Sequence, residues 1–199
     1  MVIGESEALR GAFDVAVDAH RGQQRHDGSP YIAHPLTVCE ILAARGEGET
    51  TLVAALLHDA VEDSEITVGE VTERFGVEVG ELVAALTEDD EIDDWVTRKD
   101  ALRAQVADAG ASAAAIYGAD KLANLREMRA TYAAHGEAAI DLHKAPTLDS
   151  RVAAWRADLE LVVRLAGSGL AADLRVELEA FERERATVTG DAQEAGVRG

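Results

Sequence analysis

Several features are scarce in this chain of 199 residues, and each scarcity excludes a class of protein. Cys39 is the only cysteine, so no disulfide can form within the chain and a reducing compartment is expected. No run approaches the roughly 18 apolar residues that a membrane span needs. The first ten residues are acidic and lack the apolar core of a signal peptide. These absences predict a cytoplasmic protein with no membrane partner.

Positive charge is also scarce. The chain has 19 Lys and Arg against 38 Asp and Glu, which gives a formal net charge of −19. A surface this acidic repels nucleic-acid backbones and anionic lipids, so a nucleic-acid partner is not expected. A polyanionic substrate would have to be attracted by a local positive site or by a metal.

Aromatic residues make up only 4% of the chain, whereas hydrophobic residues reach 47%. A core of Ala, Leu and Val favours close-packed helices over sheets. Apolar residues recur at spacings of three and four, and we see no convincing strand. The predicted helices cover residues 8–20, 35–42, 51–61, 67–75, 77–87, 95–106, 113–129, 148–166 and 171–186. We therefore expect an all-α bundle of about eight to ten helices, a single domain over residues 1–186, and a disordered tail over 187–199.

The strongest local signal is the sequence LLHDAVED, which ends in His58, Asp59, Glu62 and Asp63. On a continuous helix, His58 and Glu62 share a face, as do Asp59 and Asp63. An imidazole beside carboxylates suits a divalent cation such as Mn²⁺, Fe²⁺ or Zn²⁺. The alternative is a helix end with a solvated acidic turn.

Two further segments carry residues of the same chemistry. His34 precedes Pro35, which disfavours helical backbone and places His34 at a junction between a loop and a helix. Asp120 and Asn124 lie four residues apart among apolar neighbours, so they share a helix face. The alternative for His34 is a histidine in a surface loop, and the alternative for Asp120 and Asn124 is a partly exposed polar stripe on a helix.

In this order and context, five segments resemble the hydrolase domain of the RelA/SpoT family, a group of HD-domain phosphohydrolases. The similarity extends to the stand-alone small alarmone hydrolases, including their metazoan members. The segments are HRGQQR (20–25), GSPYIAHP (28–35), AALLHDAVED (54–63), residues 67–76 and ADKLANLR (119–126). A lone His-Asp pair is a weak signal, whereas five ordered segments at family spacing are a strong one.

The resemblance implies a nucleotide substrate and one bound Mn²⁺. The reaction it implies removes the 3′-pyrophosphate of guanosine tetra- or pentaphosphate, giving GDP or GTP. The implied metal ligands are His34, His58, Asp59 and Asp120. Glu62 and Asp63 would position or activate the attacking water. The implied substrate-binding residues are Arg25, Tyr31, Lys121 and Asn124, of which Tyr31 and Lys121 suit a supporting role.

The chain departs from the family pattern at three places. His26 stands where a lysine often follows the arginine, Tyr117 and Gly118 replace Lys-Leu, and Glu91 lies where some members have a lysine. All three changes remove positive charge near the expected phosphate site. An adenosine alarmone, or another nucleotide with a 2′- or 3′-phosphate, is therefore the alternative substrate. A non-catalytic HD binding module is the alternative outside enzymes.

Overall fold

The computed structural model describes residue 4, residues 6–142 and residues 145–196. The helices of these residues are α1 (Glu7–Ala19), α2 (Ala33–Ala43), α3 (Glu49–Leu57), α4 (Ala60–Asp63), α5 (Val68–Phe75), α6 (Val77–Leu86), α7 (Trp95–Ala109), α8 (Ala111–His135), the 3-10 helix η2 (Gly136–Leu142), α9 (Leu148–Leu165) and α10 (Ser168–Gly196). The only β-type pairing recorded in these ranges is an isolated bridge between Gln24 and Pro30. The predicted all-α fold is confirmed. None of the described helices is both long enough and apolar enough to cross a bilayer.

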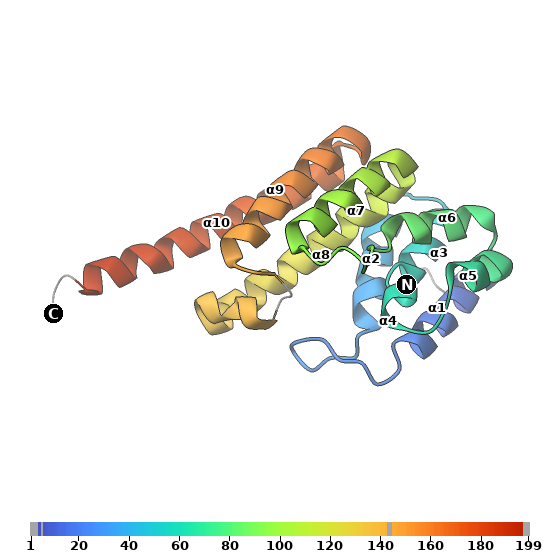
Figure 1. Cartoon of the computed structure of the whole chain (residues 1–199), viewed down its shortest axis with the longest axis horizontal. Coiled ribbons are helices and arrows are strands. Elements are labelled where there is room, and N and C mark those ends of the chain that lie inside the picture. The colour runs from blue at the N-terminus through green and yellow to red at the C-terminus, as the bar shows by residue number, and fades with distance from the viewer. Residues whose placement is uncertain (1–3, 5, 143–144, 197–199) are drawn as a thin grey trace.

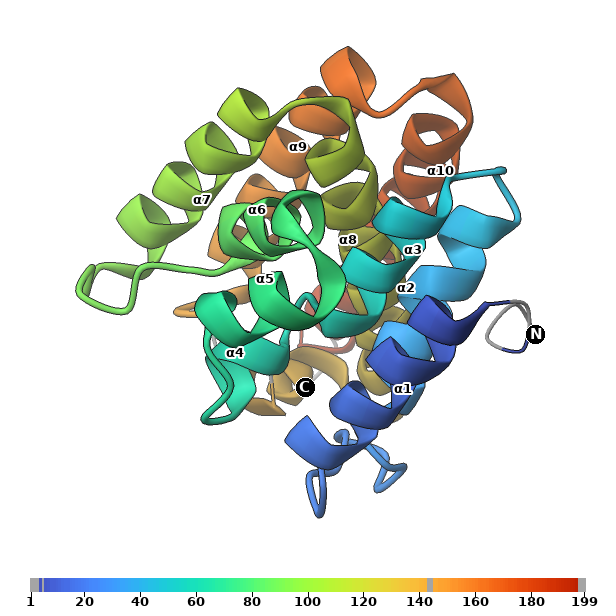
Figure 2. The ribbon, with the colours of Figure 1, turned by 90° about the vertical axis from the view of Figure 1, so that its right-hand side faces the viewer.

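Helix α8 runs through the middle of the bundle (Figures 1 and 2). It packs against α2, α3, α6 and α7, and also against η2, α9 and α10. Gly118 permits a close approach of α9 and α10, because a Cβ there would lie 2.9 Å from side-chain atoms of Val162 and Leu170. The glycine at this departure from the family pattern therefore lets α9 and α10 pack directly on α8.

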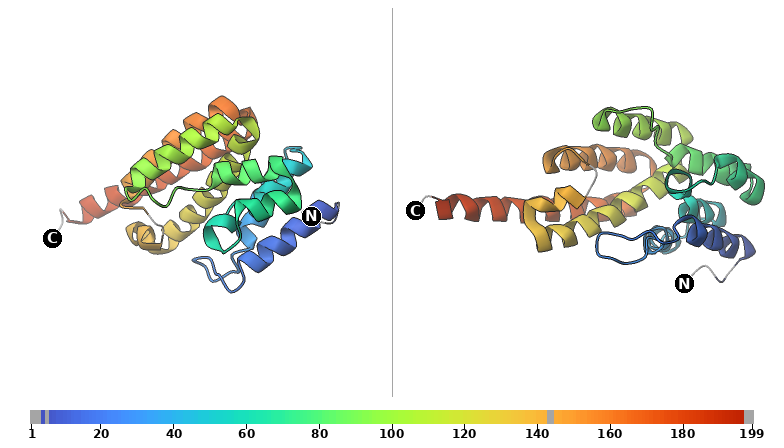
Figure 3. Two further views of the ribbon diagram at one scale, coloured as in Figure 1. Left: turned by 45° about the vertical axis from the view of Figure 1, so that its right-hand side comes forward. Right: turned by 60° about the horizontal axis from the view of Figure 1, so that its bottom comes forward.

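The remaining helices form two groups around α8. Helices α1 to α6 lie toward one end and α9 and α10 toward the other, and α7 packs against α6, α8 and α9 (Figure 3). Trp155 on α9 is 1% exposed and packs edge-on against Phe181 of α10, with ring centroids 5.7 Å apart. Trp155 is therefore a packing residue of the core between α9 and α10. The functional residues described below come from both groups and from α8 between them.

One predicted helix start is confirmed in atomic detail. Thr67 caps α5 by accepting a hydrogen bond from the Glu70 amide, and the Glu70 carboxylate accepts one from the Thr67 amide. This capping box satisfies two amides that the first helical turn leaves unpaired. Gly76, with φ of +95°, then ends α5 and begins α6, a backbone conformation that a side chain would strain.

Two predicted helix boundaries differ from the structure. The helix expected over 51–61 divides into α3 and α4, because the His58 ring donates to the Ala55 carbonyl and the chain turns at Asp59. Helix α10 ends at Gly196, whereas the sequence predicts a helix that ends at residue 186 and a disordered tail over 187–199. Strong helix formers in 192–195 favour this continuation. Residues 197–199 of that tail lie outside the described residues.

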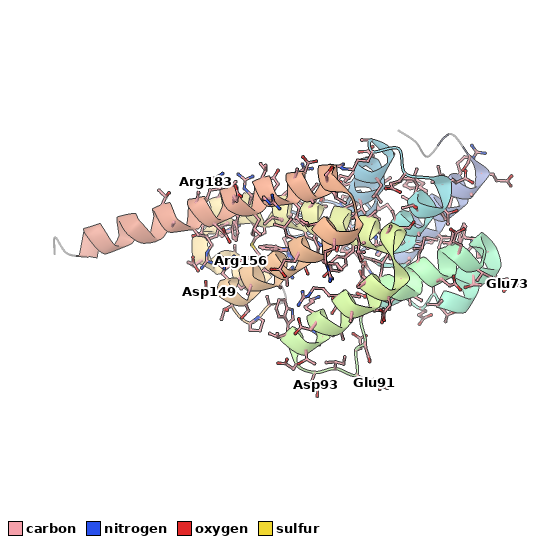
Figure 4. All side chains as sticks on the ribbon, turned by 90° about the horizontal axis from the view of Figure 1, so that it is seen from above. Glu73, Glu91, Asp93, Asp149, Arg156 and Arg183 are labelled. Atoms are coloured by element: carbon pink, nitrogen blue, oxygen red, sulfur yellow. The ribbon has the colours of Figure 1, made fainter. Side chains whose placement is uncertain are left out.

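The acidic run 88–94 forms the loop between α6 and α7. Figure 4 shows Glu91 and Asp93 at the outer edge of this loop. Glu88 differs from them, because its carboxylate points inward and pairs with Arg98 at 2.9 Å and with Lys99. The loop therefore begins with an anion that holds two cations of α7.

Candidate metal centre

Two histidines and two aspartates meet in the interior. Helix α2 supplies His34, the turn between α3 and α4 supplies His58 and Asp59, and α8 supplies Asp120. Donor atoms of His34, His58 and Asp120 all lie within 4.8 Å of one another. Asp59 completes the group, with Oδ1 3.1 Å from His58 Nε2 and Oδ2 3.6 Å from His34 Nε2. The structure thus brings together the four residues predicted as metal ligands.

His34 lies at the junction between the loop and α2, as predicted, although the helix begins two residues earlier than expected. It lies inside the first turn of α2 and not in the loop before it, with its amide donating to the Tyr31 carbonyl at 2.9 Å. Pro35 is tolerated there because the first helical turn does not need its missing amide hydrogen. The side chain still points inward, and Nε2 lies 3.0 Å from Asp120 Oδ1.

His58 carries an atom that fits a metal. Its Nδ1 donates to the Ala55 carbonyl at 2.8 Å, which leaves Nε2 to present a lone pair in the neutral ring. The side chain is 4% exposed, and Nε2 makes no well-aligned hydrogen bond with a described residue, although Asp59 Oδ1 lies 3.1 Å away. Leaving a buried polar atom unpaired costs about 1–3 kcal/mol. A divalent cation between the imidazoles and carboxylates would offset this cost, so the residues fit a metal.

Neighbouring charges keep the carboxylates ionised. Burial would raise the pKa of Asp120, but the Lys121 ammonium, 2.6 Å away, and the His34 ring hold it well below its usual value. Burial would lower the pKa of His58, but Asp59 and Asp120 outweigh burial and raise it to about 9. A cation that binds at this centre would therefore displace a proton from His58.

Two polar side chains fix the orientation of the carboxylate ligands. The Tyr31 hydroxyl donates to Asp59 Oδ2 at 2.8 Å, and Asn124 Nδ2 donates to Asp120 Oδ1 at 2.5 Å. Burial and the Asp59 charge raise the pKa of Tyr31, so it remains a hydrogen donor. Contacts of this kind orient metal ligands in proteins. Tyr31 and Lys121 thus each contact a carboxylate of the centre, Tyr31 that of Asp59 and Lys121 that of Asp120.

The two acidic residues of α4 lie beside the metal centre. Burial raises the pKa of Glu62 to about 7, although the Glu88 amide donates a hydrogen bond to its carboxylate. Asp63 lines the adjacent cavity, and its backbone carbonyl accepts a hydrogen bond from Gln23 Nε2 at 2.8 Å. A carboxyl group with a pKa near 7 suits proton transfer at neutral pH.

A cavity of about 420 Å³ adjoins the centre and contains three cations, Arg25, Lys99 and Arg151. Lys99 comes from α7 and Arg151 from α9, and both lie within 6 Å of the Trp95 ring centroid. Arg151 Nε is buried without a hydrogen-bond partner in the described part of the chain. Sequence reasoning missed Lys99 and Arg151 because neither belongs to a local motif. Only the packing of α7 and α9 against α8 brings them to the site.

Arg25 lies at the boundary of two cavities. It pairs with Glu127 of α8, with Nε 3.0 Å from Oε1, and its guanidinium lies 5.5 Å from the Tyr31 ring centroid. Arg25 and Glu127 line the cationic cavity and also a second cavity of about 360 Å³. Arg25 is therefore in place to meet a ligand, although Glu127 offsets part of its charge.

The structure also corrects the interpretation of the three departures. Tyr117 is buried, donates to Asp158 at 2.7 Å and does not line the cationic cavity. Glu91 is exposed in the acidic loop. Of these positions only His26 lines the cavities, and Lys99 and Arg151 provide positive charge that the sequence did not reveal. The absent lysines therefore say less about the substrate than the sequence suggested.

Comparisons with known proteins agree with this geometry. Over 81 residues the chain is 53% identical to a probable GTP pyrophosphokinase of Mycobacterium leprae, covering 41% of this chain and 10% of that protein. Over 86 residues it is 46% identical to a guanosine-3′,5′-bis(diphosphate) 3′-pyrophosphohydrolase of Vibrio cholerae, covering 43% and 12%. The chain thus spans about a tenth of the length of these relatives.

A solved structure and a family model extend the comparison beyond that segment. The structure was described as a metazoan ortholog of SpoT that hydrolyses ppGpp and plays a role in starvation responses. It matches with a TM-score of 0.69 and 27% identity over 90% of this chain and 96% of its own. The model of the HD domain matches residues 12–145, which include every residue of the metal centre. The chain belongs to the HD-domain family.

Proposed function

We propose that this protein hydrolyses the 3′-pyrophosphate of guanosine tetra- or pentaphosphate, giving GDP or GTP and pyrophosphate. The observation that carries the proposal is the centre formed by His34, His58, Asp59 and Asp120 beside a cavity with three cations. The relatives named above, and the metazoan structure that hydrolyses ppGpp, support this substrate.

Each part of the site has a chemical task in this reaction. A divalent ion held by the four ligands would polarise phosphoryl oxygens and make water a stronger acid. Glu62 or Asp63 accepts the proton of the attacking water. Arg25, Lys99 and Arg151 offset the charge of the substrate phosphates, and guanidinium groups suit phosphate geometry. Asn124 orients Asp120 and faces the nucleotide.

The donor set of two imidazoles and two carboxylates suits Mn²⁺, and Fe²⁺ and Zn²⁺ are the alternatives. The proposal is one ion per chain, because the described residues gather donor atoms of His34, His58 and Asp120 within 4.8 Å of one another, with Asp59 beside the two histidines. We place the reaction in the cytoplasm, since the substrate is a nucleotide and the single cysteine predicts a reducing compartment.

The experiment is a nucleotide panel assayed with Mn²⁺, in which pyrophosphate and orthophosphate are measured separately. We expect GDP and pyrophosphate from guanosine tetraphosphate. Pyrophosphate from the adenosine analogue alone would transfer the proposal to an adenosine alarmone. Orthophosphate from a 2′- or 3′-phosphorylated nucleotide would leave an HD phosphatase of different specificity. Binding without turnover in every case would indicate a non-catalytic module.

A further inference from the structure

The unpartnered polar atoms of the interior point to one residue that the proposed reaction does not use. Four such buried side-chain atoms occur in the described residues: His20 Nε2, His58 Nε2, Arg151 Nε and Trp155 Nε1. His58 and Arg151 belong to the metal centre and the cationic cavity, and Trp155 lies in the core between α9 and α10. His20 is left. It is 4% exposed at the end of α1, in the first segment that resembles the family.

We infer that His20 is a positioning residue, which fixes the backbone of Asp63 through Gln23 and supports the ring of Tyr31. The inference rests on the proposed function, because Asp63 matters there as a candidate proton acceptor and Tyr31 as the partner of Asp59.

A chain of two hydrogen bonds connects His20 to Asp63. Gln23 Nε2 lies 2.8 Å from the backbone carbonyl of Asp63, and a carbonyl oxygen can only accept, so this atom is the amide nitrogen. The Gln23 oxygen therefore faces His20 Nδ1, also at 2.8 Å, and must accept a hydrogen bond from it. The ring thus carries its hydrogen on Nδ1, and the amide of Gln23 has a single orientation.

The His20 ring also contacts the ring of Tyr31. Its centroid lies 4.6 Å from that of Tyr31, with an interplanar angle of 31°. The Tyr31 hydroxyl in turn donates to the metal ligand Asp59. One histidine at the end of α1 therefore touches two chains of contacts, one to Asp63 and one to Asp59, that enter the site from different segments.

A role as a helix cap does not account for the side chain. The amide of His20 donates to the Ala16 carbonyl, and this backbone contact survives any substitution except proline. Packing alone does not account for it either, since phenylalanine would fill the same space without leaving a buried nitrogen unpaired at a cost of about 1–3 kcal/mol. The ring nitrogen that makes a hydrogen bond is Nδ1, and its partner is Gln23.

Two substitutions separate the ring from its hydrogen bond. His20→Phe keeps the aromatic contact with Tyr31 and removes the donor, whereas His20→Asn keeps a donor near the position of Nδ1 and loses the ring. We expect His20→Phe to lower kcat about tenfold or more, because small displacements of a reacting group are costly. KM should change less than about twofold, since the cations that would bind phosphate are untouched. Bound metal should stay near one per chain, and His20→Asn should recover part of kcat.

A second readout does not depend on turnover. Hydrogen exchange of the amides in 62–65 should be faster in His20→Phe than in the wild type, and Gln23→Leu should reproduce this change. Tyr132→Phe is the matched control, because it removes a hydrogen bond from a buried ring to Glu137 far from the site. It should alter neither kcat nor exchange in 62–65.

The inference stands only if kcat and exchange both respond in His20→Phe. Normal kcat, or unchanged exchange in 62–65, would show that His20 merely fills space and would overturn it. A wild type that hydrolyses no nucleotide of the panel would overturn the proposed function instead. In that case the exchange measurement alone decides whether His20 holds Asp63.

Discussion

Replacing the two cations that the sequence did not reveal should have unequal effects. Lys99 is already paired with Glu88, so part of its charge is offset before a phosphate arrives. Arg151 is half-buried, and its buried Nε has no partner among the described residues, so a phosphate would satisfy it for the first time. Hydrogen bonds to charged groups contribute about 1.5–3 kcal/mol. We expect the contact of Lys99 with a phosphate to contribute a free energy at the lower end of that range, and the contact of Arg151 one at the upper end.

At about 1.4 kcal/mol for each factor of ten, Lys99→Met should reduce kcat/KM about tenfold and Arg151→Met about a hundredfold. The free energy of unfolding should not fall with the activity of Arg151→Met. Burial holds the pKa of Arg151 below its usual value, which means that the folded protein disfavours this charge. Arg151→Met should therefore leave stability unchanged or raise it while activity falls.

The assay is steady-state hydrolysis of guanosine tetraphosphate with Mn²⁺, together with urea denaturation of each variant. Arg156→Met is the control, because Arg156 lies on the same helix, is exposed, and pairs with Glu182 of α10 (Figure 4). The control should retain the wild-type kcat/KM. Wild-type kcat/KM in both Lys99→Met and Arg151→Met would refute the assignment of the cationic cavity to phosphate. A larger loss of kcat/KM in Lys99→Met than in Arg151→Met would refute the expectation that Arg151 contributes more than Lys99.

Three further results follow from the geometry. Glu62→Gln and Asp63→Asn should each keep the bound metal, and loss of the proton acceptor should lower kcat about 10²–10⁴-fold; two normal variants would place the proton acceptor elsewhere. Because the pKa of His58 is about 9 without metal and the ligand must be neutral, metal affinity should rise about tenfold per pH unit between pH 6 and 8. Calorimetry in two buffers would detect the released proton, and pH-independent affinity would contradict this. Arg25→Ala should raise KM and Glu127→Gln should lower it, since the latter frees Arg25; equal KM values would exclude Arg25 as a phosphate contact.

The sequence predicts local features of this protein better than those that arise from packing. The capping box at Thr67 and the end of α1 could be read directly, because each depends on a few neighbouring residues. The break between α3 and α4 could not, because it depends on the His58 ring donating to the Ala55 carbonyl. Propensity alone extends that apolar helix further.

The same distinction holds for the site. Residues that resemble family motifs, such as His34 and Asp120, meet in the structure as the resemblance implied. Lys99 and Arg151 carry no motif, and their meeting depends on how α7 and α9 pack on α8. The inward direction of Glu88, inside a run of acids that predicts a solvated loop, likewise depends on the cations of α7.

The central claim is that one divalent metal at this centre drives hydrolysis of the 3′-pyrophosphate. The direct measurement is the rate of GDP and pyrophosphate formation from guanosine tetraphosphate against the amount of Mn²⁺ returned to chelated protein. We predict no turnover without metal, a linear rise that ends at one equivalent per chain, and no recovery in His58→Ala. Full turnover by metal-free protein, or normal recovery in His58→Ala, would contradict the account.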